Sequence, residues 1–95
     1  MAAYIIADVE ITDPDEYQRY GRQVPPTLER YGGKFLVRGG QPETIEGDWN
    51  TKRIVIIEFP SVEQAKAWYD SPEYSSIAGI RHHSAHSRIV LVQGT

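Results

Sequence analysis

Side chains alternate with a period of two along four segments of the chain, which is the pattern of β-strands. The first segment is dense in β-branched and aromatic residues, and one of its faces carries Ile5, Ala7, Val9 and Ile11. Its other face carries Tyr4, Ile6, Asp8 and Glu10. The alternation predicts strands over residues 4–11, 34–38, 52–59 and 87–93.

A helix is predicted to start directly after the first strand. Asp13 is a suitable N-cap, Pro14 fits the first helical position, and Glu16 can reach back to the cap. Apolar residues at spacings of three and four give this helix one buried stripe, formed by Tyr17, Tyr20, Val24, Leu28 and Tyr31. We expect the Pro25-Pro26 pair to kink or interrupt the helix, and the Gly32-Gly33 pair to end it.

A second capping box, Ser61 followed by Gln64, predicts another helix, which ends near Asp70. Its apolar positions are Val62, Ala65, Trp68 and Tyr69. Ser71-Pro72-Glu73 then predicts a short helical segment. Its inward positions are Tyr74, Ile77 and Ile80.

Glycines interrupt the chain between the second and third strands. Gly39-Gly40 predicts a β-bulge or a bend, followed by a short extension of the strand around residues 44–46. Residues 47–50 supply the turn into the third strand.

The resulting order, β-α-β-β-α-β, predicts a single α+β domain over residues 1–95 with the ferredoxin-like arrangement, in which the helices cover one face of a four-stranded antiparallel sheet. The third and fourth strands are nevertheless apolar on both faces. Ile54 and Ile56 lie opposite Val55, Ile57 and Phe59 on the third strand, and Ile89 and Leu91 lie opposite Val90 and Val92 on the fourth. An uncovered apolar sheet face is an aggregation hazard in water. We therefore expect it to meet the same face of a second copy in a homodimer.

Motifs spread over almost the whole chain resemble the domain of unknown function 1330 family. They are Arg38-Gly39-Gly40, Glu46-Gly47-Asp48-Trp49, Arg53, Phe59-Pro60-Ser61 and the run from Trp68 to Tyr74. The resemblance implies a dimeric α/β barrel, the fold of small cofactor-free monooxygenases, muconolactone isomerase, stress-induced barrel proteins and ligand-sensing regulatory domains. The family has no established catalytic residues, so the resemblance assigns none here.

Composition excludes several classes of function. The net charge of −3 comes from 13 acidic and 10 basic residues scattered along 95 positions, without the basic stripe of a nucleic-acid-binding protein. The chain has no cysteine, which excludes disulfides and thiolate chemistry. No signal peptide or membrane-spanning run is recognisable, so we expect a cytoplasmic protein without a membrane partner.

Three arginines at the ends of elements are the strongest candidates for ligand binding: Arg38, Arg53 and Arg81. A guanidinium group binds carboxylate or phosphate through two parallel hydrogen bonds, so the three would form an anion site if they met in one cleft. The alternative is that each pairs with an acid of the chain or extends into solvent. Trp49, Tyr69 and Tyr74 are the aromatic residues expected to line a pocket, whereas Trp68 fits the core.

His82, His83 and His86 invite a metal site, but neighbouring positions point to different sides and no acidic residue lies nearby in the sequence. One histidine acting as a proton acceptor is the better interpretation. No phosphate-binding loop, nucleophile elbow or dinucleotide motif is present, and we expect no cofactor. Three hypotheses remain: a cofactor-free enzyme acting on a small anionic or aromatic molecule, a binding or sensing module without chemistry, and a purely structural dimer.

Overall fold

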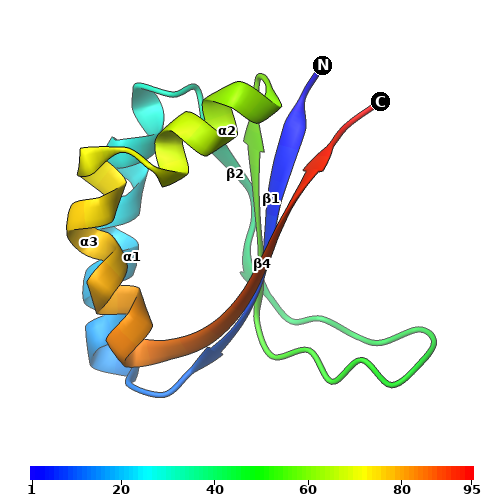
Figure 1. Ribbon diagram of the computed structural model, residues 1–95. Helices are drawn as coiled ribbons and strands as arrows, with labels where there is room; N and C mark the ends of the chain where they lie inside the picture. Colours follow the sequence, from blue (N-terminus) through cyan, green and yellow to red (C-terminus); the bar gives the residue numbers. More distant parts are fainter.

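One antiparallel sheet of four strands is covered on one face by three helices (Figure 1). The computed structural model describes residues 1–95. Its strands are β1 (Ala3–Ile11), β2 (Lys34–Gly40), β3 (Ile54–Phe59) and β4 (Ala85–Gln93). Its helices are α1 (Pro14–Glu29), α2 (Val62–Tyr69) and α3 (Pro72–Ser84). No helix is long and apolar enough to cross a membrane.

The strands lie in the order β2-β3-β1-β4, so that β1 pairs with β3 along one edge and with β4 along the other. This order, with α1 and the α2–α3 pair packed on the same side, is the ferredoxin-like fold that the sequence predicts. Ile5, Ala7 and Val9 of β1 are buried beneath the helices, as the alternation indicates.

The opposite side of the sheet, which we call the bare face, carries no helix (Figure 1), and the loop between β2 and β3 contacts it at Asp8. The register places its apolar residues in one patch: Tyr4, Ile6, Val37, Ile54, Ile56, Val90 and Val92. Val90 is 59% exposed and Val92 is 46% exposed. The chain by itself therefore leaves in water the apolar surface that the sequence analysis singles out.

Helix α1 begins where predicted, with Asp13 Oδ1 accepting from the Glu16 amide at 3.3 Å. Of the kink or interruption predicted at the two prolines, the interruption does not occur, because α1 runs continuously through Pro25 and Pro26. Pro25 has no N–H for the carbonyl of Gly21, four residues earlier. The Arg38 guanidinium donates to that carbonyl instead, so the helix keeps its acceptor satisfied.

The segment between β2 and β3 departs from prediction. The strand extension around residues 44–46 does not form, and residues 41–53 contain neither helix nor strand. Figure 1 shows this segment as a long loop that projects from β2 and β3 on the side of the sheet away from the helices. Ile45 is 89% exposed, so the structure offers no apolar surface against which a strand at this position could pack. β3 starts at Ile54 rather than at residue 52, although Val9 N still donates to Arg53 O at 2.9 Å.

Helix α3 is longer than the short segment predicted, and it places His82 and His83 in its last turn. The Ser71 hydroxyl caps its start by accepting from the Tyr74 amide at 3.1 Å. At the other end, the Ser84 hydroxyl donates to Ile80 O at 2.6 Å, which allows the helix to continue directly into β4.

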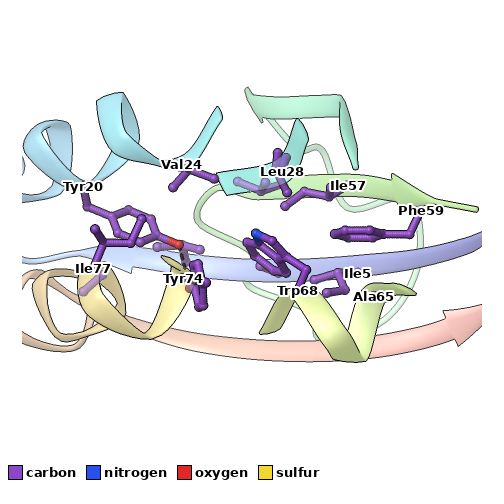
Figure 2. Packing of buried hydrophobic residues seen from close by; sticks show 14 of the residues in the cluster. Ile5, Tyr20, Val24, Leu28, Ile57, Phe59, Ala65, Trp68, Tyr74 and Ile77 are labelled. Carbon is purple, nitrogen blue, oxygen red and sulfur yellow. Dashed lines mark hydrogen bonds between the residues drawn. The ribbon is translucent and has the colours of Figure 1, made fainter. Parts of the chain in front are cut away.

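The core lies between the helices and the sheet, as Figure 2 shows for the side chains of Tyr20, Trp68 and Tyr74. Trp68 is buried, and its Nε1 donates to Thr27 Oγ1 at 2.9 Å. Because that bond ties α2 to α1, Trp68 has the structural place that the sequence predicts for it.

Candidate ligand-binding cavity

A cavity of about 460 Å³ lies between the helices and the covered face of the sheet. Its walls are mostly apolar, and they include Ile5, Ala7, Val9, Val55, Ile57 and Ile89 from the strands. A cavity of this size in a chain of 95 residues makes it the candidate ligand site.

Arg38 enters the cavity from the end of β2, where two bulges set its direction. Its guanidinium lies 4.4 Å from the centroid of the Phe35 ring and donates to Gly21 O, the carbonyl that Pro25 leaves free. Both contacts fix the position of the cation without neutralising its charge. Pro25, although it lies within α1, therefore helps to position Arg38, because it leaves the Gly21 carbonyl free to accept.

Arg53 enters from the residue just before β3. Its guanidinium lies over the backbone of Gly39, where a Cβ would fall 2.0 Å from Nη1. Gly39 also has φ +80, so this position of the Arg38–Gly40 bulge requires glycine for its backbone conformation as well as for the space it leaves. Arg53 Nε is buried without a hydrogen-bond partner, and its Cζ lies 5.6 Å from the Tyr17 ring centroid.

Arg81 reaches the cavity from α3 and is only 6% exposed. Its Nε donates to the Tyr74 hydroxyl at 3.1 Å, and that hydroxyl lies 2.8 Å from the Tyr20 hydroxyl (Figure 2). Burial, reinforced by Tyr74, raises the pKa of Tyr20 far above its ordinary value, so Tyr20 stays neutral. The third group beside Arg81 is the His82 ring, whose Nε2 lies 3.2 Å from Nη2 and accepts, because arginine can only donate.

None of these three arginines forms an ion pair within the chain. The salt bridges are Arg19–Glu16, Arg30–Glu73 and Lys34–Glu58, all at the surface. Asp15 lines the cavity but pairs with none of them. Arg38, Arg53 and Arg81 therefore line one largely apolar cavity without a carboxylate partner, an arrangement that favours an anionic ligand.

The profile of a family described as a domain of unknown function, DUF1330, matches residues 2–95. The chain belongs to the DUF1330 family. No curated protein sequence matches it.

Solved structures share the DUF1330 fold at low sequence identity. A protein of unknown function from Rhodopseudomonas palustris is 23% identical, with a TM-score of 0.79 over 99% of this chain and 82% of that one. SnoaB, a cofactor-independent oxygenase from Streptomyces nogalater, is 15% identical, with a TM-score of 0.71 over 99% and 93%. A dimeric ferredoxin-like protein of unknown function from a Jannaschia species is 11% identical, with a TM-score of 0.66 over 99% and 100%.

Five of the six residues predicted to bind a ligand line this DUF1330 cavity: Arg38, Arg53, Tyr69, Tyr74 and Arg81. Trp49 does not join them. It is 58% exposed in the loop after β2, and its Nε1 lies 3.3 Å from the carboxylate of Asp8, on the bare face. That the five bind a ligand stays a prediction.

Several residues that line the cavity were not predicted from the sequence to belong to a site. Tyr17, Tyr20 and Trp68 line the cavity, although their helical spacing assigned them to the core, and the exposed Arg22 lines it too. Their periodicity shows only that a side chain faces the sheet. It does not show that the layers beneath leave a void.

The three histidines do not form one group, although His82 and His86 line the same shallow hollow. His82 and His83 lie in the last turn of α3, whereas the register pairs His86 with Glu10 on the bare face. The chain contains no group of three or more His, Asp or Glu residues that could hold a metal ion.

Proposed function

We propose that the cavity binds a small organic anion with an apolar or aromatic body. The observation that supports this most is the convergence of Arg38, Arg53 and Arg81, none of which has a carboxylate partner, on a void of about 460 Å³. Pockets for small molecules are typically about 300–1,000 Å³, apolar, and provided with a few polar groups that orient the ligand.

Arg38 and Arg53 are the proposed holders of the anionic group. Arg53 places its guanidinium over the backbone of Gly39, the residue next to Arg38, so it lies at the bulge from which the Arg38 side chain starts. Arg53 Nε is buried and unpartnered, which leaves a donor that a bound carboxylate oxygen can satisfy. The Tyr17 ring and the strand residues Val55 and Ile57 provide apolar surface for the body of the ligand.

The bare face is the proposed homodimer interface. Its apolar residues, Ile6, Ile56 and Val90 among them, adjoin one another across three strands. A two-fold axis lets the same patch on two copies bury itself. The dimeric ferredoxin-like protein from Jannaschia, which shares the fold, supports this assembly.

A cofactor-free enzyme is the second candidate function, and the Tyr20–Tyr74–Arg81 chain favours it. Neutral tyrosine hydroxyls held by a buried cation are hydrogen-bond donors suited to an oxyanion, such as the enolate or phenolate formed when a substrate loses a proton. The cofactor-independent oxygenase SnoaB shares the fold and supports this choice of chemistry. A sensing module without chemistry would use the cavity but would not need these hydrogen-bonded tyrosines beside Arg81.

Binding is tested by thermal-shift and calorimetric titration with small carboxylates and phenols. A ligand at a hundred times its dissociation constant adds about 2.7 kcal/mol, which should raise Tm by roughly 10 °C or more. Arg53→Met should abolish the shift, whereas Arg30→Met, which removes a surface arginine paired with Glu73, should keep it. If every ligand that binds the protein also binds Arg53→Met equally well, the proposed site is wrong.

Turnover is then measured on each ligand that binds, by oxygen consumption and by proton exchange in deuterated water, without added metal or cofactor. Tyr74→Phe should lower kcat about 100-fold and change the ligand dissociation constant little, because the hydroxyl acts on the oxyanion rather than on the resting ligand. A binding module would show the affinity and no turnover.

A further inference from the structure

A second hollow of about 420 Å³ lies beside the edge strand β4, next to the cavity. Tyr69, Arg81 and Ile89 line both, so the two spaces meet at these side chains. The remaining lining residues are His82, Ala85, His86 and Ser87. This hollow is far more polar than the cavity, which makes it suited to a charged end of a ligand rather than to its body.

Arg81 has hydrogen-bonding capacity left over for this space. A guanidinium carries five N–H donors, and only Nε and Nη2 form bonds within the chain, to Tyr74 and His82. Nη1 forms none. Since Arg81 is nine-tenths buried and has no carboxylate partner, its charge is compensated by no anion of the protein.

Ser87 supplies a second unsatisfied donor. Its hydroxyl oxygen is buried and has no hydrogen-bond partner. The register pairs Ser87 with Val9, so its side chain lies on the helix-covered side of β4, as does that of Ile89 two residues later. His86 directly precedes Ser87, and its pairing with Glu10 assigns its side chain to the bare face.

The end of α3 does not oppose an anion in this hollow as strongly as a free helix C-terminus would. The Ser84 carbonyl accepts from the amides of Thr12 and Asp13 at 2.8 and 3.0 Å, which offsets part of the negative helix end. The full positive charge of Arg81 lies in the same turn. The local field therefore favours negative charge.

We propose that the hollow receives a second acidic group of the same ligand, held by Arg81 Nη1 and the Ser87 hydroxyl. The ligand is then a small dicarboxylate: one carboxylate lies at Arg38 and Arg53, an apolar body fills the cavity, and the other carboxylate passes Tyr69 to reach Ser87. This inference rests on the proposed function, because it assigns the first carboxylate to the same cavity.

The test compares monocarboxylates with dicarboxylates of the same body by calorimetric titration of the full chain. Probes are benzoate against the three benzenedicarboxylates, and phenylacetate against 1,4-phenylenediacetate, which together sample several spacings. Charge-assisted hydrogen bonds predict that at least one dicarboxylate binds about tenfold or more tightly than its monocarboxylate.

Two variants locate the second carboxylate. Ser87→Ala should weaken that dicarboxylate about three- to tenfold and leave the monocarboxylate unchanged, while Tm stays the same or rises, because the lost hydroxyl has no partner. Ser87→Val should narrow the hollow and remove the dicarboxylate advantage. As a control, Ser75→Ala, which alters an exposed serine of α3, should change neither affinity.

The outcomes separate the two proposals. If monocarboxylates bind but no dicarboxylate binds more tightly, or if its advantage survives both Ser87 variants, the second subsite is wrong and the cavity site stands. If neither class binds the wild-type chain, the cavity site and the subsite are both overturned.

Discussion

The helix-covered face of the sheet and the bare face alternate along the same strands, and both are rich in Ile and Val. The covered face holds the core, yet it leaves a void of about 460 Å³ into which three arginines without carboxylate partners extend. The bare face lies open to water, and the charged or titratable residues there face each other across strands, as Asp8 faces Arg88 and Glu10 faces His86.

The two faces differ in whether their charged groups are hydrated by water or must be paired within the protein. A charged group on the bare face is hydrated, so it needs no particular partner. Under the helices the same charge loses its water, and Arg81 is compensated only by Tyr74 and His82. A small domain has little free energy to spare for such a cavity and for a buried cation without an anion, which is why we propose ligand binding for the covered face and association for the bare face.

Two adjacent residues of β3 test this contrast with the largest expected effect. Ile57 is buried beneath the helices, and Ile56 lies on the bare face. Ile57→Asp should lower the free energy of unfolding by about 5 kcal/mol or more, close to the stability of a whole domain. Ile56→Asp should leave the fold intact and convert the proposed dimer to a monomer, because like charges would meet across its two-fold axis.

Urea unfolding and light scattering measure the two effects. A wild-type chain that is monomeric at micromolar concentration would contradict the assignment of the bare face. Equal destabilisation by the two variants would contradict the contrast itself.

Tyr20 gives the covered face a dependence on pH. Burial raises its folded-state pKa, whereas the unfolded chain ionises it near pH 10. Its contribution is therefore complete below about pH 10, and stability falls above it by about 1.4 kcal/mol per pH unit until the folded-state pKa is reached. Tyr20→Phe should be about 1 kcal/mol less stable at neutral pH and should lose this alkaline slope. Urea titrations between pH 9 and 11 measure it, and parallel slopes for the two proteins would contradict it.

Filling the void should separate stability from binding. Ala7 lines the cavity from the central strand. Ala7→Leu should raise the free energy of unfolding by about 1 kcal/mol through added apolar contact and should abolish ligand binding. Thermal unfolding and calorimetry with the same ligand measure both, and a stabilised variant with full affinity would show that the ligand binds elsewhere.

Pro25 provides the smallest and most specific test. Pro25→Ala restores an N–H that competes with Arg38 for the Gly21 carbonyl, so the guanidinium loses one of its anchors. Ligand affinity should fall about three- to tenfold, the equivalent of one net hydrogen bond. Pro26→Ala is the matched control, because its partner in the helix would be Arg22, whose carbonyl takes no bond from Arg38. Equal losses in the two variants would exclude the positioning role.

The sequence by itself determined the strands, the helix starts and the two faces, because each depends on neighbours only a few residues apart. Asp13, Ser61 and Ser71 cap helices where their spacing predicts. The bulge at Gly39 and the apolar residues on both faces of β3 and β4 were also predicted from local sequence. The continuity of α1 through Pro25 was not predictable, since the donor that replaces the missing N–H comes from β2.

Only the tertiary structure decided which residues share the cavity. A bulge at Leu36, between Phe35 and Val37, adds one residue to β2 and so turns Arg38 to the helix-covered side, the same side as Phe35. Without that extra residue the period of two would place Arg38 on the bare face. Arg53 and Arg81 join it from segments far apart in sequence, while the loop takes Trp49 away to Asp8. Periodicity reports the face on which a side chain lies, whereas convergence depends on registers and packing between distant elements, which local spacing does not encode.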